Sequence, residues 1–383
     1  MMNRVTPIPE ELLRVQTSPC ISIYMQTSRC YPENAQDPLR FKNLVSKAES
    51  DALKSVGKRV IAPLIERLRM LQEEKDFWNH TLEGLAIFVS PDYFKVFKLQ
   101  QAVNEQAYVS DVFFIKPLIR IYQMNERFQV LALTKTEVHL FEGNRYRLDE
   151  IEMDREVPKT MIEALGTEIT PPHMTIASYG GVAQGSFMRH GHSSRKDEEE
   201  LDEERFFRAV DHAITERHSK PSGLPLILAA LPQHQSVFRS VSRNPHLLED
   251  GIAGDPRLLE TDALRELAWK VLEPQWQRKI DGLLARFEEA LSKALGSDNP
   301  FYITEAALAG NVSVLLLDQQ RIYPGGIDAA AGDISFSKMT PGNEHDVLED
   351  LAITVLGKGG EVLVLPPERM PTVSGVAAIF RHE

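Results

Sequence analysis

The stretch RHGHSSRK, residues 189–196, combines residue types that could perform acid–base chemistry. Imidazole changes its protonation near neutral pH, so His190 and His192 could act as an acid/base pair or contribute to a metal site. Gly191, Ser193 and Ser194 are expected to make the segment around these histidines mobile. No metal site is predicted, because an H-x-H pair in a loop has no fixed geometry and no further ligands are evident.

The same stretch carries positive charge. Arg189, Arg195 and Lys196 would attract phosphate, and they precede a predicted helix whose amino terminus also favours anions. The acidic run DEEELDEE, residues 197–204, follows them and is typical of the first turns of a solvated helix. An ordinary solvent-exposed loop is the alternative interpretation of residues 189–196.

A second glycine-rich segment, YGGVAQG, lies a few residues upstream. Gly180 and Gly181 make it glycine-rich, and Gln184 is its one versatile polar group. The segment contains neither a P-loop nor a dinucleotide-binding pattern, so no cofactor is predicted.

Four polar residues follow the apolar run LPLILAAL, residues 224–231. Ligands often collect at the carboxyl ends of such buried strands. A capped surface helix is the other interpretation of this segment, which contains His234, Arg239, Arg243 and His246.

Hydrophobic periodicity predicts that three domains position these residues. Residues 1–122 are expected to form an α+β domain: a strand at CISIYMQ, two amphipathic helices, and strands at 84–90, 93–99 and 112–118.

Residues 123–298 are expected to form a middle domain with a mixed sheet covered by helices. It contains a three-strand meander at 128–151, the buried strand, and a helix from Leu201 with Phe206, Phe207, Val210 and Ile214 on one face. A long helical pattern from about residue 262 to 295 is interrupted at Pro274.

Residues 299–383 are expected to form a small α/β/α sandwich after a hinge at GSDNP. Thr304 is predicted as an N-cap and Gly310 as a left-handed helix stop, followed by a buried strand from Val312 to Leu317. A second helix and strand, and a closing strand at GVAAIF, complete the sandwich.

Composition narrows the function classes. The net charge of −12 argues against nonspecific nucleic-acid binding, and no DNA partner is predicted, although a local basic face could still dock on structured RNA. The two cysteines, Cys20 and Cys30, match no zinc spacing and are interpreted as reduced structural thiols. No membrane segment or signal-peptide core is evident, which favours the cytoplasm.

The order of these segments resembles a known family. ISIYMQT, the GLAIFVSPDYFKVFKL hairpin, the meander VLALTKTEVHLFEG, the glycine loop before ERFFRAVDHAI, and ITEAALAGNVSVLLLD together are similar to the archaeo-eukaryotic class 1 release factors and Pelota. The closer likeness is to their bacterial relatives, the bacterial archaeo-eukaryotic release factor family, over nearly the whole chain.

The resemblance implies an RNase H-like middle domain and a third domain similar to kink-turn-binding ribosomal proteins. It also implies a Gly-Gly-Gln loop that helps water to attack the peptidyl-tRNA ester on the ribosome. The matching place here is Gly191, His192, Ser193 and Ser194, where the glutamine is missing, and the resemblance carries over no codon-reading motif.

The leading hypothesis is therefore a ribosome-associated release or rescue factor, with peptidyl-tRNA as substrate and a GTPase as a potential partner. Backbone groups and a histidine could still position a water for ester hydrolysis. One alternative is a noncatalytic RNA- or protein-binding factor. Another is an independent phosphodiesterase that uses His190, His192 and an acid, and it would lose activity with a chelator.

Overall fold

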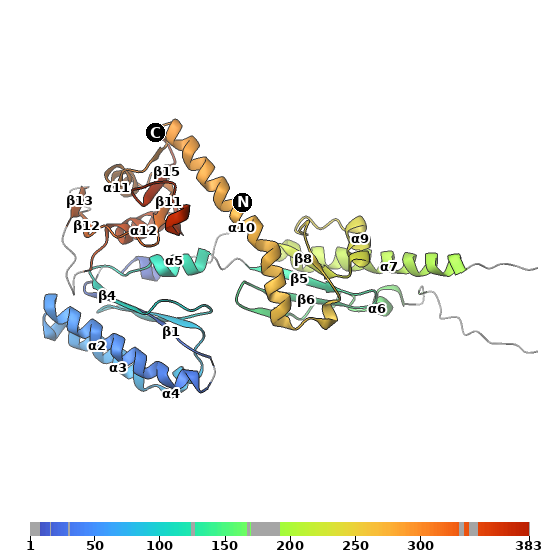
Figure 1. The fold of residues 1–383 in the computed structure, drawn as a ribbon, viewed down its shortest axis with the longest axis horizontal. Helices are drawn as coiled ribbons and strands as arrows, with labels where there is room; N and C mark the ends of the chain where they lie inside the picture. Colours follow the sequence, from blue (N-terminus) through green and yellow to red (C-terminus); the bar gives the residue numbers. More distant parts are fainter. Residues whose placement is uncertain are drawn as a thin grey trace, which may run out of the picture. The chain divides into compact units, whose positions relative to one another are not determined.

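The structure is a computed structural model that describes residues 8–15, 17–29, 31–123, 127–166, 169, 192–328, 333–336 and 344–382. It contains two compact units. One combines residues 1–125 with residues 277–383, and the other comprises residues 126–276. Both units mix helices with sheets, which confirms the predicted mixed α/β class (Figure 1).

An antiparallel sheet forms near the start of the chain, with the order β3-β2-β1-β4. Its strands are β1 (Cys20–Gln26), β2 (Gly84–Val89), β3 (Phe94–Leu99) and β4 (Gln106–Ser110). Alternate residues of a strand face opposite sides, so Ile21 and Ile23 of β1 enter one core while Tyr24 enters another. This two-sided burial explains the apolar character of β1.

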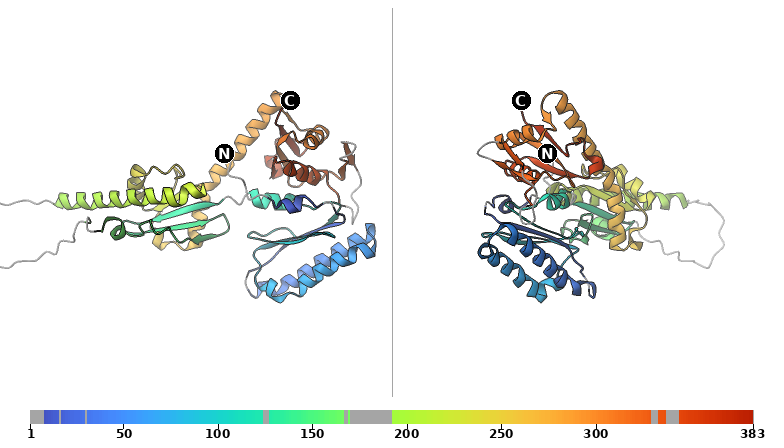
Figure 2. Two further views of the ribbon diagram at one scale, coloured as in Figure 1. Left: turned by 180° about the vertical axis from the view of Figure 1, so that it is seen from behind. Right: turned by 60° about the vertical axis from the view of Figure 1, so that its left-hand side comes forward.

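Two amphipathic helices, α2 (Asp37–Ser55) and α3 (Lys58–Glu73), cover one face of this sheet, as Figure 2 shows from two further sides. Their apolar residues recur every three or four positions, which confirms the predicted helices. The short helical segments of this part are α1 (Glu10–Leu13), a 3-10 turn (Glu33–Gln36), α4 (Lys75–Asn79) and α5 (Lys116–Gln123).

The last part of the chain forms a second sheet in the same unit, with the order β10-β15-β11-β14. Its strands are β10 (Gly296–Ser297), β11 (Val312–Asp318), β14 (Glu361–Leu365) and β15 (Val376–Phe380), and its helices are α11 (Pro300–Ala309) and α12 (Val347–Gly357). A separate ladder joins β12 (Gly325–Asp328) to β13 (Asp333–Phe336), and a 3-10 turn spans Pro367–Arg369.

These two sheets share one apolar core. The second face of the first sheet contributes Tyr24 and Phe88, and α12 contributes Leu348 and Leu351 to the same cluster. Apolar burial of this kind is the main driving force for folding. The two ends of the chain therefore form one folded body.

The other unit is built on a mixed sheet of order β7-β6-β5-β8-β9. Its strands are β5 (Phe128–Leu133), β6 (Val138–Gly143), β7 (Leu148–Glu150), β8 (Leu226–Ala230) and β9 (Ile252–Ala253). β5, β6 and β7 form the predicted antiparallel meander, whereas β5, β8 and β9 run parallel. Every residue of β8 is buried, as predicted for a strand covered on both faces.

Helices cover both faces of this mixed sheet (Figure 1). One face is covered by α6 (Met161–Leu165), α7 (His192–Ile214) and α9 (Pro232–Val241), and the other by the first half of α10 (Thr261–Ser292). Helix α7 continues through a π-helical turn (Thr215–Ser219) into α8 (Lys220–Ser222), and a 3-10 turn spans Pro256–Leu258.

Several predicted boundaries were wrong. The segment 112–118 is not a strand: the missed strand β4 precedes it and α5 begins at Lys116. Pro117 is tolerated there because a proline in the first turn of a helix removes no intrahelical bond. The backbone amides of Ile115 and Lys116 are bonded to Glu349, a partner too distant in sequence for a local pattern to reveal.

Two features of the last segments also differ from the predictions. Helix α10 continues through Pro274 without interruption. The N-cap of α11 is Asn299, which accepts a bond from the amide of Phe301, whereas Thr304 lies inside the helix and donates its hydroxyl to the Pro300 carbonyl. Gly310 does end α11, at a φ of 76°.

No described helix is long and apolar enough to cross a membrane.

Candidate functional site

Most of the predicted loop lies outside the described residues. This applies to Gly180, Gly181, Gln184, Arg189, His190 and Gly191. His192, Ser193, Arg195 and Lys196 belong to the backbone of α7, which starts at His192 and not at Leu201. Because α7 starts at His192, the acidic run of residues 197–204 begins after the first turn of the helix, and the first turn itself contains no acidic residue. The predicted stabilisation of the helix amino terminus by these acids is therefore wrong, since the dipole effect falls off within the first turn.

Helix α7 is fixed to the mixed sheet by the predicted aromatic face. Phe206, Phe207, Val210 and Ile214 are all fully buried in the core beside β5 and β8. Leu201, predicted on the same face, is instead 46% exposed. The first part of α7 extends beyond the edge of the sheet (Figure 1), so the helix starts away from the core that holds its second half.

A buried histidine–carboxylate pair joins α7 to α9. His234 Nδ1 lies 2.5 Å from Glu203 Oε1, and both side chains are about nine-tenths buried. The ring of Phe207 packs edge-on against His234. The acidic run of residues 197–204 was interpreted as solvated, but Asp202 and Glu203 are buried, and the buried Glu203 carboxylate is paired with His234 of α9.

His234 also lines a small pocket at the carboxyl ends of parallel strands. The pocket is formed by residues 133–136 at the end of β5, Leu231 and His234 after β8, and residues 255–257 after β9. From β5 the chain turns to β6 on one side, and from β8 it proceeds to β9 on the other. Such a switch point is where open sheets of this kind commonly bind ligands.

Ion pairs surround this pocket. Arg257 donates to both carboxylate oxygens of Asp255, which keeps the pKa of Asp255 below its usual value. Lys135 Nζ lies 3.0 Å from Glu199 of α7. Because each cation already has an acidic neighbour, the pocket has no excess of positive charge with which to attract phosphate.

The other polar residues predicted near His234 brace the backbone. Arg239 donates to the carbonyl of Leu248, and the amide of Arg243 donates to Asp211 of α7. His246 donates its amide to the Asn244 side chain. These contacts fit the interpretation of this segment as a capped surface helix.

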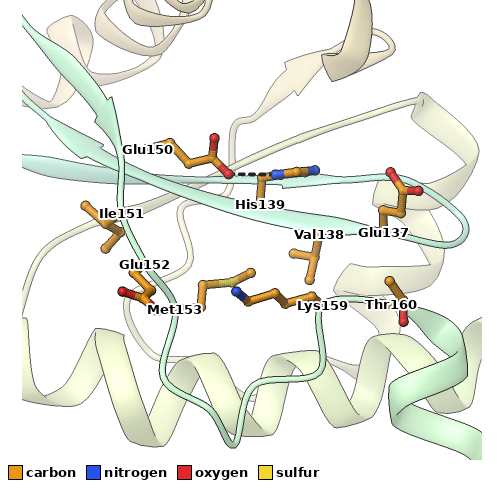
Figure 3. A pocket seen from close by; sticks show the side chains of 9 residues that line it. All are labelled: Glu137, Val138, His139, Glu150, Ile151, Glu152, Met153, Lys159 and Thr160. Atoms are coloured by element: carbon orange, nitrogen blue, oxygen red, sulfur yellow. Dashed lines mark hydrogen bonds and ion pairs between the residues drawn. The ribbon is translucent and has the colours of Figure 1, made fainter.

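A wider pocket of about 570 Å³ lies beside β6 and β7 (Figure 3). His139 and Glu150 point toward each other there, with His139 Nδ1 2.7 Å from Glu150 Oε1. Glu137, Glu152 and Lys159 also line it. Its carboxylates outnumber its cations, so it does not suit the phosphates of RNA.

The described residues contain no group of three or more histidine, cysteine, aspartate or glutamate side chains that could hold a metal ion. Cys20 is buried and unpaired, and burial raises the pKa of its thiol to about 12. A high pKa lowers the reactivity of a thiol, which fits the interpretation of Cys20 as a structural residue. Cys30 lies outside the described residues.

The middle of the chain matches a known protein family. Residues 127–311 match the model of bacterial archaeo-eukaryotic release factor family 3. The predicted resemblance is therefore confirmed. The match to this release factor family spans the whole mixed sheet, α7 and α10. No curated protein matches the chain.

The chain is also similar to several solved structures. An archaeal translation termination factor, aRF1, is 16% identical, with 97% of this chain and 96% of that one covered and a TM-score of 0.25. Dom34 of S. cerevisiae is 12% identical, with 78% and 79% covered and a TM-score of 0.37. A ribosome-bound archaeal Pelota is 11% identical, with 78% of each chain covered and a TM-score of 0.39.

Proposed function

We propose that this chain is a translation termination or ribosome-rescue factor of the release-factor type. The family match over residues 127–311 carries this proposal, because it covers the helices and sheet that would hold the predicted loop. The ribosome is the expected partner, and a GTPase is a further candidate partner.

The finer proposal is that the factor hydrolyses the peptidyl-tRNA ester through residues 189–196. A ribosomal active centre mainly requires positioning of a water and exclusion of bulk solvent. Gly191 would allow close backbone approach, and His192 would supply general-base help at the start of α7. Arg189, Arg195 and Lys196 would contact RNA phosphates.

A noncatalytic docking factor is the second candidate. It is favoured by one observation: the family glutamine is missing at Gly191-His192-Ser193-Ser194. Such a factor would need only the fold and the charge of the loop to bind the ribosome, and it would not hydrolyse the peptidyl-tRNA ester.

The test is cosedimentation of the protein with stalled ribosomes over a salt series, followed by assay of peptidyl-tRNA in the pellet. Hydrolysis predicts loss of the ester with wild-type protein, and retained binding without that loss for Gly191→Ala or His192→Ala. His212→Ala is the matched control, since His212 is an exposed histidine of the same helix.

Each outcome separates the candidates. Binding with an intact ester supports the docking factor. Absence of binding at every salt concentration rejects both ribosomal functions and leaves a shared fold alone.

A further inference from the structure

The residues just before α12, together with its first turn, dock on the edge of the first sheet. The amide of Glu344 donates to the Val109 carbonyl at 3.0 Å, and the amide of Val109 donates to the Glu344 carboxylate at 3.3 Å. Val109 belongs to β4, the outermost strand on that side. The contact thus satisfies part of an edge that would otherwise present unpaired backbone groups.

A histidine lies between carboxylates from both ends of the chain. His345 Nε2 is 2.9 Å from Asp350 Oδ1 of α12, and His345 Nδ1 is 3.9 Å from Asp111 Oδ2, just after β4. Burial lowers the pKa of His345, but the bond to Asp350 and the charges of Asp350, Asp111 and Asp346 outweigh it and raise the pKa. The imidazole thus lies between acidic groups from both ends of the chain, and these groups favour its protonated form.

The carboxyl group of Glu349, next to Asp350 in the first turn of α12, is fully buried. Glu349 Oε2 accepts the amide of Ile115 at 2.7 Å and the amide of Lys116 at 3.1 Å. Burial raises the pKa of Glu349 to about 8, and Asp346 adds to the shift while Lys116 and the two amides oppose it. Burial therefore favours the protonated form of this side chain more in the docked segment than in water.

A buried ion pair completes the contact. Lys116 Nζ lies 2.7 Å from Asp346 Oδ2, and neither side chain is more than 4% exposed. Glu344, in the same segment, also has a raised pKa, because burial outweighs its bond to the Val109 amide. Further titratable or charged groups that face the docked segment are Tyr24 of β1, Tyr108 of β4, and Lys47, Asp51 and Lys54 of α2.

We propose that docking of residues 344–350 onto the first sheet is a proton-dependent clasp. The closed form binds protons at His345 and Glu349, and the open form, in which both side chains meet water, releases them. Closure of the unit is thereby coupled to pH.

Both groups act with the same sign. For Glu349, the closed form binds the extra proton between its ordinary pKa of 4.5 and about 8, so closure weakens as pH rises through this window. For His345, the contribution is complete below its ordinary pKa of 6.5 and is lost as pH rises through the raised value. One such proton changes the opening equilibrium about tenfold per pH unit.

Hydrogen exchange of the full chain tests the clasp, since protection reports even rare opening. The amides of Ile115 and Lys116 donate to Glu349 and become exposed when the clasp opens. After correction for intrinsic exchange, the peptide that contains them is expected to lose about tenfold protection per pH unit where one group releases its proton, and more where both do, between about pH 6 and pH 8. A peptide from β8, in the other unit, is expected to keep its protection.

Variants separate the clasp from general unfolding. Glu349→Gln keeps an acceptor oxygen but no ionisable group, and combined with His345→Gln it is expected to remove the contributions of these two groups and so to weaken the pH dependence strongly. His139→Gln, a control histidine paired with Glu150 in the other unit, is expected to leave it unchanged. Constant protection in the wild type, or an undiminished pH response in the double variant, would overturn the proposal.

Discussion

Replacing Lys116 by methionine is expected to destabilise the unit formed by the two ends of the chain. The lysine ammonium bonds Asp346 at 2.7 Å and the carbonyl of Arg321 at 2.8 Å. Methionine fills similar space but leaves the buried Asp346 carboxylate without its cation. Removing one partner of a buried ion pair costs about 3 to 5 kcal/mol, because the remaining charge is uncompensated.

The structure indicates the lower end of this range. Asp346 keeps the amides of Tyr323 and Leu348 as donors, at 2.8 and 3.1 Å, and these bonds partly compensate its charge. We therefore expect a loss of about 3 kcal/mol in the free energy of unfolding, more than a hundredfold in the equilibrium constant.

Urea unfolding followed by the fluorescence of one tryptophan measures this loss. Of the three tryptophans, Trp78 is buried beside α3 in this unit, so Trp269→Phe and Trp276→Phe leave a reporter of that unit alone. Lys54→Met is the control, because the Lys54 ammonium forms a half-exposed pair with Asp51.

The control should change stability by less than about 1 kcal/mol. A Lys116→Met effect no larger than that of Lys54→Met would refute the assigned role of the buried pair.

Three further changes test other parts of the structure. Phe207→Ala removes a fully buried ring from the contact between α7 and the mixed sheet. We expect the free energy of unfolding, measured in urea with Trp269 as the reporter, to fall by about 3 to 5 kcal/mol. A decrease below about 1 kcal/mol would contradict the packing. Gly310→Ala forces a side chain onto a φ of 76°, so thermal unfolding should show a loss of about 1 to 2 kcal/mol, and an unchanged midpoint would argue against this turn. Burial raises the pKa of Cys20 to about 12. In a Cys30→Ser variant, Cys20 should therefore react with a thiol reagent only after unfolding in urea. Rapid labelling of the native protein would disprove its burial.

Local sequence patterns predicted the elements that depend only on the residues within the element itself. The buried strand β8 and the Gly310 stop needed only hydrophobicity and backbone preference. The start of α5 could not be predicted in this way, because its first amides are bonded to Glu349, which lies 234 residues later. VFFIKPL was consequently interpreted as a strand.

The candidate site was less predictable than the fold. His234 was identified by its place after a buried strand, but its partner Glu203 was grouped with solvated acids. An isolated sequence cannot show that one acid in an acidic run faces another helix. The residues with the strongest chemical signal, His190 and Gly191, lie outside the described residues.

The division of one core between the two ends of the chain sets an order for folding during synthesis. Tyr24 and Phe88 belong to a core completed by Leu348. At about 5 to 20 residues per second, the 234 residues between Ile115 and Glu349 take roughly 10 to 50 s to synthesise. During that interval the unit formed by residues 126–276 can be completed, while the first sheet keeps an apolar face without its cover. The nascent chain is therefore most prone to aggregate before α12 emerges, and truncation ahead of α12 would make that vulnerable state permanent.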